Sequence, residues 1–307
     1  KICDGPRVRQ TMREAAVAQG KTGTENMNFG AIYPECSMRD ARFVVVPVPY
    51  DLTSTYQPGS RRGPAAIIEA SGNMELYDEE LKKETYLAGI HTSSPVEIDA
   101  RGPKQTIAAV RKKISRIVAQ NKIPVMLGGE HSITLGAVQA VAEKYPQLTV
   151  LQLDAHADLR DSYQGSPFSH ACVARRIAEF CTLVQAGIRS MSAEEGEYLP
   201  ASKVKSYGAD YIFDNSGWVE EVCSHLKGDV YITIDLDVFD PSIMPATGTP
   251  EPGGLYWRDA LKLLKTAAGR CNVRGFDVVE LAPLPAMVAP DFMAARLAYR
   301  LMGYINK

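Results

Sequence analysis

The sequence lacks the features of several large protein classes. It has no uninterrupted apolar run of 18 residues that could span a membrane, and residues 1–20 are too polar for the core of a signal peptide. Lys and Arg number 34 against 36 Asp and Glu, a net charge of −2. There is thus no basic excess to neutralise the phosphates of nucleic acid. We therefore expect a cytoplasmic protein with neither a membrane nor a nucleic acid as partner.

Two motif classes are also missing. The glycine-rich segment 248–254 matches neither the G-x-G-x-x-G pattern nor the G-x-x-x-x-G-K-[ST] pattern. Its prolines lack the N–H groups that would bind a phosphate, so we interpret it as a shaped loop. No G-x-S-x-G turn is present to carry the nucleophile of a serine hydrolase.

Cysteine gives no disulfide or zinc pattern. The chain has six cysteines and none of them forms a C-x-x-C pair. A chain of 307 residues buries enough apolar surface to fold without disulfides, so we expect free thiols in a reducing compartment. Cys172 lies two residues after His170, and we interpret it as a packed thiol rather than a nucleophile.

The composition is that of a folded chain, with 45% hydrophobic and 23% charged residues. Residues 1–40 have no clear hydrophobic period and are predicted to form an N-terminal arm or cap. No repeat, low-complexity block or linker divides residues 41–307, which are predicted to form one catalytic domain. The sequence begins with Lys1 rather than Met, so we leave open whether a further segment precedes Lys1.

Short apolar runs alternate with segments of helical period over most of the chain. The predicted strands are 42–48, 123–127, 148–153, 183–188, 230–234 and 274–279. The predicted helices are 103–120, 132–145, 170–180, 218–226, 257–268 and 290–305. This alternation predicts an α/β fold with a mainly parallel sheet that is covered by helices on both faces. Ligands of such sheets bind beyond the carboxyl ends of the strands.

Polar residues follow four of the predicted strands. They are the segments 128–132 (GGEHS), 154–158 (DAHAD) and 235–237 (DLD), and the single residue Glu280. If the DAHAD segment stays extended, alternation points Asp154, His156 and Asp158 to one side. We expect all four strand ends to meet at one edge of the sheet.

The charges at this edge predict a binuclear metal centre. Four aspartates would be very costly to bury without balancing charge, and two divalent cations would balance them. Oxygen and imidazole ligands without a thiolate favour Mn²⁺, Mg²⁺ or Fe²⁺ over structural zinc. A lone D-x-D is ordinarily a turn or a helix cap, so the prediction rests on the joint pattern. The predicted ligands are His131, Asp154, His156, Asp158, Asp235 and Asp237.

These motifs resemble the signature segments of the ureohydrolases, the arginase/agmatinase family. The matching segments are GGEHS (128–132), DAHAD (154–158), SHA (169–171), DLDVFDPSIMPATGTPEPGG (235–254) and GFDVVELAP (275–283). Residues 158–176 (DLRDSYQGSPFSHACVARR) look most similar to the bacterial and archaeal agmatinase branch. The resemblance covers roughly residues 40–305.

The resemblance implies a three-layer α/β/α arginase-like fold around a parallel sheet of about eight strands. It implies two Mn²⁺ ions, although Ni²⁺, Co²⁺ and Fe²⁺ remain open. It also implies a homo-oligomer, a trimer or a hexamer. By motif position, one metal would be held by His131, Asp154, Asp158 and Asp235. The other would be held by Asp154, His156, Asp235 and Asp237, so that Asp154 and Asp235 bridge the pair.

The resemblance also implies how a guanidino group is cleaved to urea and a primary amine. A metal lowers the pKa of bound water and so supplies a nucleophile at neutral pH, and Asp158 would accept its hydrogen bond. Glu280 and Thr249 would bind the guanidino group, Glu280 through a paired, charge-assisted contact. His170 would pass a proton to the leaving amine.

Two residues depart from the family pattern. Glu130 stands in GGEHS where many members have aspartate, and we expect it beside the metal ligands. Arg160 lies where the arginases have neutral polar groups that bind the α-carboxylate and α-amine of arginine. If Arg160 faced the pocket it would repel an amine and could bind a carboxylate. Pairing with Asp161 or with a neighbouring subunit is the interpretation we favour.

The leading prediction is a manganese-dependent agmatinase that makes putrescine and urea in polyamine metabolism. The alternatives are guanidinobutyrase, arginase, an enzyme for a longer polyamine guanidine, and a non-catalytic metal-binding partner subunit. A metal-dependent amide deacetylase of related fold is weaker still, because such enzymes hold one zinc with fewer carboxylates. Residues 57–63 and 282–290 are predicted to shape the mouth of the pocket.

Overall fold

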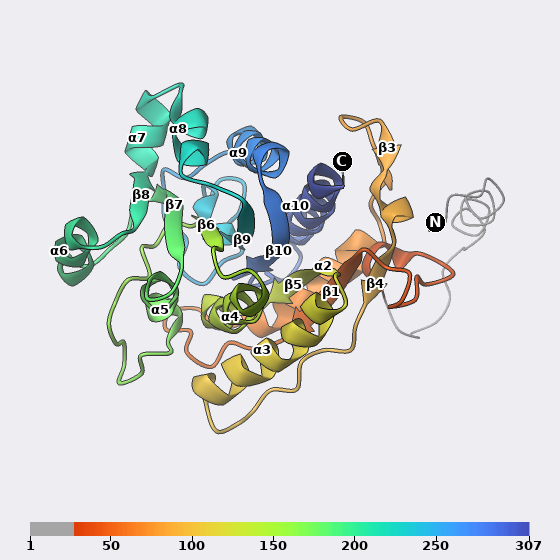
Figure 1. Cartoon of the computed structure of the whole chain (residues 1–307), viewed down its shortest axis with the longest axis horizontal. Coiled ribbons are helices and arrows are strands. Elements are labelled where there is room, and N and C mark those ends of the chain that lie inside the picture. The colour runs from red at the N-terminus through yellow and green to blue at the C-terminus, as the bar shows by residue number, and fades with distance from the viewer. Residues whose placement is uncertain (1–27, 307) are drawn as a thin grey trace.

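The computed structural model describes residues 28–306, which form an eight-stranded sheet between two layers of helices (Figure 1). The strand order is β4-β1-β5-β10-β9-β6-β7-β8, and every neighbouring pair is parallel. The strands are β1 (Phe43–Val48), β4 (Ile90–Thr92), β5 (Ile123–Gly128), β6 (Thr149–Leu153), β7 (Thr182–Ile188), β8 (Lys205–Gly208), β9 (Asp229–Asp235) and β10 (Asn272–Val279).

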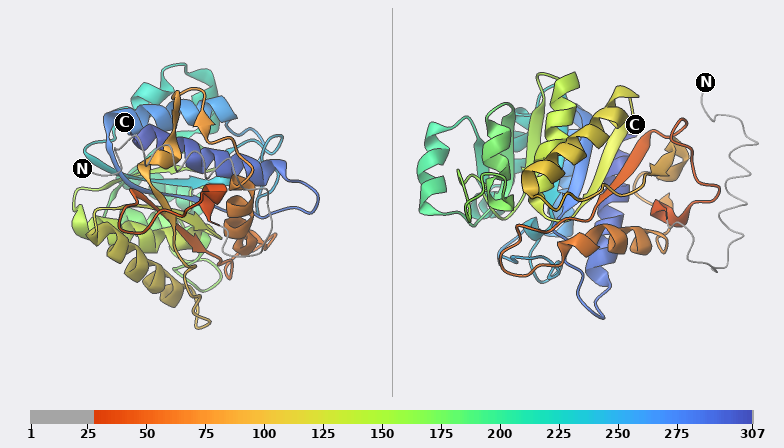
Figure 2. Two further views of the ribbon diagram at one scale, coloured as in Figure 1. Left: turned by 90° about the vertical axis from the view of Figure 1, so that its right-hand side faces the viewer. Right: turned by 90° about the horizontal axis from the view of Figure 1, so that it is seen from below.

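The helices pack on both faces of this sheet (Figure 2). One layer consists of α3 (Pro103–Ala119), α4 (Thr134–Lys144) and α5 (Val173–Ala178). The other consists of α2 (Gly63–Ser71), α8 (Trp218–Ser224), α9 (Trp257–Arg270) and α10 (Ala289–Ile305). Helices α6 (Ala193–Ala201) and α7 (Ala209–Asp214) flank β8 at the end of the sheet (Figure 1). The three-layer α/β/α fold predicted from the motifs is therefore confirmed.

Successive side chains along each strand point to opposite faces of the sheet, so they pack into two separate hydrophobic cores. In β1, Phe43 and Val45 face one helix layer, whereas Val44, Val46 and Val48 face the other. Every residue of β1 is buried, as expected for a strand covered on both faces.

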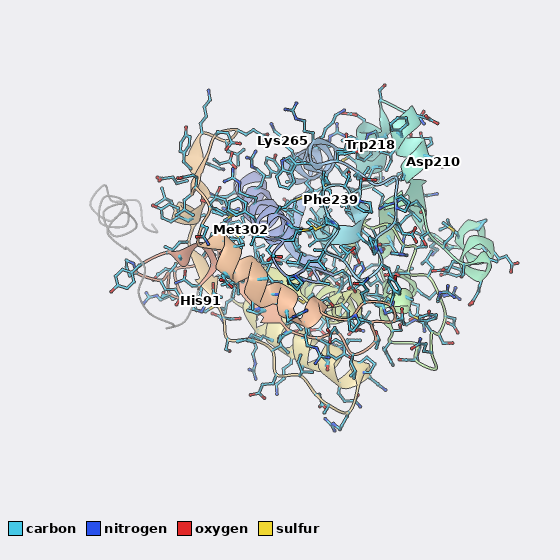
Figure 3. The ribbon with its side chains drawn as sticks, turned by 180° about the vertical axis from the view of Figure 1, so that it is seen from behind. His91, Asp210, Trp218, Phe239, Lys265 and Met302 are labelled. Atoms are coloured by element: carbon cyan, nitrogen blue, oxygen red, sulfur yellow. The ribbon has the colours of Figure 1, made fainter. Side chains whose placement is uncertain are left out.

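The core on the α8–α10 side continues beyond the strands themselves. Trp218, Phe239 and Met302, labelled in Figure 3, all belong to it.

The predicted elements are confirmed with boundary shifts of a few residues. The two expected helices that follow strands at the site each begin with a short 3-10 turn, η4 (His131–Ile133) and η5 (His170–Cys172). The prediction missed α2, α6, α7, β4, β8 and a small antiparallel hairpin of β2 (Tyr77–Asp78) and β3 (Lys83–Glu84). Most of these elements are short, and their burial patterns lack a clear period of 2 or 3.6.

The predicted N-terminal arm lies mostly outside the described residues. Its last part belongs to the main core, because Phe29 and Ile32 pack in the same cluster as α2 and α10. The N–H of Phe29 donates to Thr92 Oγ1 at 2.9 Å. Among residues 28–306, no helix is long and apolar enough to cross a membrane.

Candidate active site

Polar side chains from several strand ends converge on one cavity of about 250 Å³. Two glycines allow the close approach of the loops that form it. A Cβ on Gly129 would lie 1.8 Å from the Tyr50 carbonyl oxygen, and Gly187 has a φ of +103° with a Cβ position against Val238. Of the predicted site residues, those that line the cavity are His131, His156, Asp158, His170, Asp235, Asp237, Thr249 and Glu280.

One group of candidate metal ligands surrounds His131, which follows β5. Its Nδ1 atom lies 3.1 Å from Asp154 Oδ2, 3.3 Å from Asp158 Oδ2 and 3.3 Å from Asp235 Oδ2. All four side chains are buried. The ligand atoms of His131, Asp154 and Asp235 lie close enough together to hold one ion.

A second group shares Asp154 with the first. It consists of Asp154, His156 and Asp237, whose ligand atoms also lie within 4.8 Å of one another. His156 Nδ1 is 2.8 Å from Asp237 Oδ2 and 3.8 Å from Asp154 Oδ1. The six predicted ligands are thus brought together. Asp154 belongs to both groups, whereas Asp235, the other predicted bridging ligand, belongs to the first alone.

The backbone of residues 154–158 is not extended as we expected. Asp158 has a φ of +54°, in the left-handed region, so the DAHAD segment is a turned loop and not a continuation of β6. After β9, Asp237 lies in a 3-10 turn, η6 (Leu236–Val238). Asp235 caps that turn by accepting a hydrogen bond from the Asp237 N–H at 2.9 Å. The D-x-D segment therefore forms a cap and also points both carboxylates into the site.

The carboxylates of this cluster repel one another in the absence of a cation. Burial raises the pKa of Asp235 well above its usual range, and the charges of Asp237 and Asp154 raise it further. Burial also raises the pKa of Asp154, again with a contribution from Asp237. For Asp237, burial opposes ionisation, but the neighbouring His156 brings its pKa below the usual value.

The pKa values of the two histidines, His131 and His156, are raised as well. Burial opposes their protonation, but the surrounding carboxylates outweigh it. They raise the pKa of His156 to about 11 and that of His131 well above its usual value. Raised pKa values on both kinds of group mean that the cluster takes up positive charge, as protons when no metal is present.

The hydrogen bonds of His131 test whether a metal fits. Thr233 Oγ1 donates to Asp277 Oδ1 at 2.6 Å, so at His131 Nε2, 2.8 Å away, it accepts. The proton of neutral His131 is therefore on Nε2. Its Nδ1 atom is buried without a hydrogen bond and directs a lone pair at three carboxylate oxygens. A metal ion at that position would satisfy all of these atoms in place of the proton that the metal-free cluster takes up, so the residues fit a metal site.

Glu280 follows β10 and places a buried carboxyl group at the wall of the cavity, beside His131. It has a φ of +66° and accepts a hydrogen bond from the His131 N–H at 2.6 Å. Burial raises the pKa of Glu280 well above its usual value, and the charge of Glu130 adds to the shift. Within the described part of the chain, no Lys or Arg forms an ion pair with Glu280. A cationic ligand would therefore supply its missing counter-charge.

His170 lies at the start of η5 and lines the cavity. The Tyr163 ring meets it edge-on at 6.0 Å between centroids. Thr249 lines the cavity from the glycine-rich segment, half-buried. That segment is a shaped loop as expected, because Asp240 accepts the N–H groups of Gly253 and Gly254 at 2.9 and 3.2 Å.

Arg160 faces the cavity, and its partner differs from the one that we expected. Asp161 pairs instead with Arg176 at 2.7 Å. The Arg160 guanidinium lies over the Tyr163 ring at 4.9 Å and 3.8 Å from Oε2 of the buried Glu195. Its charge is thus balanced within the same chain.

Two further expectations concern the surroundings of the site. Cys172 is a buried free thiol, and burial raises its pKa to about 11, which agrees with a packed thiol.

Gln57 lines the cavity, but none of residues 282–290 does, so only the first of the two segments predicted to shape the pocket mouth, residues 57–63, contributes to its wall.

Several residues of the site were missed by the strand-end argument. Thr53 follows β1 and Arg189 follows β7, two strands whose ends we did not examine. The same rule would have found Arg189, which directly follows its strand, but not Thr53, which lies farther along the loop after β1. Thr233 and Asp277 are buried polar residues inside otherwise apolar strands, and this contrast was the available signal.

Comparison with known proteins agrees with the fold and the site. A model of the arginase family matches residues 41–303. The N(1)-aminopropylagmatine ureohydrolase of Synechocystis sp. is 39% identical over 276 residues, which cover 87% of this chain and 90% of the relative. The agmatinase of Pyrococcus horikoshii is 36% identical over 284 residues, covering 90% and 96%.

The crystal structure of the agmatine ureohydrolase of Thermoplasma volcanium superposes with a TM-score of 0.83 at 33% identity, covering 93% of this chain and 95% of that one. The chain belongs to the arginase family and is a hydrolase of that family. The family predicted from the motifs is therefore confirmed.

Proposed function

We propose that this protein is a manganese-dependent agmatinase, which hydrolyses agmatine to urea and putrescine. The observation that carries the proposal is the pair of ligand groups sharing Asp154, beside a cavity that Glu280 and His170 also line. The two relatives named above, both ureohydrolases, support the same reaction class.

The proposed metal ligands are the six side chains of the two groups. One ion would be held by His131, Asp154, Asp158 and Asp235, and the other by Asp154, His156, Asp235 and Asp237. When bound, divalent cations lower the pKa of water and supply a nucleophile at neutral pH. The oxygen-rich donor set without thiolate supports Mn²⁺.

Glu280 binds the guanidinium in this proposal. A guanidinium is planar and presents paired N–H donors, which match the two oxygens of a carboxylate. One Glu280 oxygen already accepts the His131 N–H, so the carboxylate is oriented before the substrate arrives. Thr249, on the facing loop, contacts the same guanidino group.

Asp158 and His170 handle the protons. Asp158 accepts a hydrogen bond from the attacking water and directs it at the guanidinium carbon. His170 donates a proton to the alkyl nitrogen as its bond to that carbon breaks. The balance is one alkylguanidinium and one water giving urea and one alkylammonium ion.

The far end of the cavity supports a substrate without a carboxylate. Among the residues that line the cavity in the described part of the chain, Arg160 is the one Lys or Arg, and its charge is already opposed by Glu195. Agmatine ends in an ammonium group, and a neutralised Arg160 repels it less than a free guanidinium would.

N(1)-aminopropylagmatine is a second candidate substrate. Tyr56 and Met191 line the cavity and are exposed to 71% and 45%, so the outer wall is open and apolar. A longer polyamine tail could lie along these side chains with its amines in water. A relative named for this substrate adds to the case.

The test is urea release by the Mn²⁺-loaded protein from agmatine, N(1)-aminopropylagmatine, arginine and 4-guanidinobutyrate. We expect one of the two polyamine guanidines to lead both carboxylate-bearing compounds. Arg160→Ala should leave turnover of the polyamine guanidines within a few-fold. A lead for arginine or 4-guanidinobutyrate, abolished in Arg160→Ala, would overturn the substrate assignment.

The remaining expectations belong to the same proposal. We infer a cytoplasmic enzyme of polyamine metabolism that assembles as a homo-trimer or homo-hexamer. We also retain the boundary near residue 40 between an N-terminal arm and the catalytic domain, and the family match that begins at residue 41 supports it.

A further inference from the structure

Three residues from different loops form a hydrogen-bonded chain that ends at the cavity. Glu130 precedes the ligand His131 and is fully buried. Its Oε2 accepts the Thr53 N–H at 2.6 Å, and its Oε1 accepts the hydroxyls of Thr53 and Ser132. Thr53 Oγ1 in turn lies 3.3 Å from Nδ1 of His170 and accepts the His170 N–H at 3.1 Å.

The donors in this chain fix its direction. The Thr53 N–H lies at one Glu130 oxygen and the hydroxyls of Thr53 and Ser132 lie at the other, and an ionised carboxylate accepts from all three. A threonine hydroxyl has one proton, and Thr53 gives it to Glu130. Thr53 Oγ1 can therefore only accept at His170, so Nδ1 of the imidazole must carry a proton.

We propose that Thr53, held by Glu130, is a positioning residue that fixes the tautomer of His170 with the proton on Nδ1 and the lone pair of Nε2 toward the cavity. This inference rests on the proposed proton transfer by His170. In this tautomer, Nε2 takes up a proton from the water side and returns it to the leaving amine. In the other tautomer Nε2 would already carry a proton in the neutral ring and could not accept one.

Ser169 is the competing partner. Its Oγ lies 3.4 Å from Nδ1 of His170 and could in principle donate to an unprotonated Nδ1. That arrangement would direct the Nδ1 lone pair at Thr53 Oγ1 as well, an oxygen with no proton left to offer. The Thr53–Glu130 contact therefore decides between the two tautomers.

The loop that carries Thr53 is itself anchored, so the contact is preorganised. The buried Asp51 accepts the N–H groups of Gly59 and Arg61 at 2.9 and 3.3 Å, and it pairs with the Arg61 side chain. The loop is closed at its base before any substrate binds.

The kinetic test compares Thr53→Val, which removes the hydroxyl at nearly constant shape, with Thr53→Ser, which keeps it. Thr53→Val should lower kcat by roughly 10²-fold with little change in KM and should alter the pH profile of kcat. Thr53→Ser should restore most of the rate. Ser169→Ala should change kcat less than about twofold. A wild-type kcat and pH profile in Thr53→Val would overturn the inference.

A spectroscopic test does not depend on activity. The chain has five histidines, so ¹⁵N-labelled imidazoles can be observed in the full-length protein loaded with diamagnetic Mg²⁺, and His170→Asn assigns the signal. Neutral His170 should show a protonated Nδ1 in the wild type and a tautomer mixture in Thr53→Val. A protonated Nε2 in the wild type would contradict the inference. If the protein cleaved no guanidine compound, the proposed function would fail while this measurement still decided the tautomer.

Discussion

At the scale of the residue, two acidic side chains of the site depend on unusual backbone conformations. Asp158 and Glu280 are not glycines, yet their φ values are +54° and +66°. Such conformations cost of order 1–3 kcal/mol and persist only where the surroundings hold them. Here the Asp158 carbonyl accepts the Arg175 N–H at 3.1 Å, and the Glu280 N–H donates to the Gly129 carbonyl at 2.8 Å. The strained backbone is therefore at the two positions, Asp158 and Glu280, where the chain turns after a strand and directs a carboxyl group into the cavity.

The metal-free cluster should make stability depend on pH. Asp154 and Asp235 have pKa values raised by burial above those of the unfolded chain, so the folded state binds more protons and loses stability as pH rises. His156 acts in the same direction, because its pKa rises from 6.5 to about 11. The lowered pKa of Asp237 acts in the opposite direction, but only below its unfolded value of 3.8.

The melting temperature of chelator-treated protein should therefore fall steadily between about pH 5 and about pH 8. With Mn²⁺ bound, the metal takes the place of these protons, so the melting temperature should be higher and should not fall with pH over the same range. Thermal unfolding with and without a chelator measures this. A metal-free protein that becomes more stable toward pH 8 would contradict the electrostatic account of the cluster.

At the scale of the element, Arg189 connects the end of β7 to the turn after β9. Its Nη2 donates to the Asp237 and Glu251 carbonyls at 2.7 and 2.8 Å, and its Nε donates to the Pro252 carbonyl at 3.0 Å. The planar guanidinium reaches these carbonyls at once, which an ammonium group cannot do. One side chain thus sets the position of η6 and of the glycine-rich loop.

Arg189→Lys should cost about 1–3 kcal/mol of stability and weaken metal binding by the Asp154–His156–Asp237 group. Denaturant unfolding and metal titration give both quantities. Arg101→Lys is the matched control, because Arg101 forms an exposed pair with Asp99 and should leave stability nearly unchanged. Equal effects of the two substitutions would show that Arg189 does not hold the loops.

The elements also show which features the sequence can predict. Strands such as β1 and β9 are mostly apolar and buried, and α3 and α9 have a strong helical period, so all four were predicted. β4 and β8 have three and four residues and depend on pairing with longer neighbours. Their stability comes from tertiary contacts that no local pattern encodes.

The residues of the candidate site likewise include some that the sequence predicts and some that it does not. Its six proposed ligands lie at the ends of strands or shortly after them, so a local rule and the motifs predict them together. Thr53 reaches His170 across 117 positions, and Glu195, not the adjacent Asp161, faces Arg160. These partners depend on how loops from distant parts of the chain pack.

At the scale of the whole molecule, an ion-pair cluster around the buried Arg300 connects the β2–β3 hairpin to α10. Arg300 Nε lies 2.6 Å from Asp78 Oδ2, and both side chains are almost completely buried. Arg300 also pairs with Glu79 and Glu80. None of these residues lines the active-site cavity.

Arg300→Met should destabilise the protein by about 3–5 kcal/mol, because it leaves the buried Asp78 carboxylate without its cationic partner. Activity per folded molecule should persist. Lys265→Met removes a more exposed partner of Glu80 and should cost less than about 1 kcal/mol. A loss below about 1 kcal/mol in Arg300→Met, from denaturant unfolding curves, would mean that the cluster does not anchor the hairpin.

The central claim is that this fold brings two metal ions to a guanidinium-binding pocket. The most direct measurement is urea release from agmatine by protein whose Mn²⁺ content is determined on the same sample, for the wild type and Asp235→Asn. The account predicts two ions per wild-type chain, urea and putrescine in equal amounts, and loss of both metal and turnover in the variant. A wild type with two ions that released no urea from any guanidine compound, or a variant with unchanged metal content and activity, would contradict it.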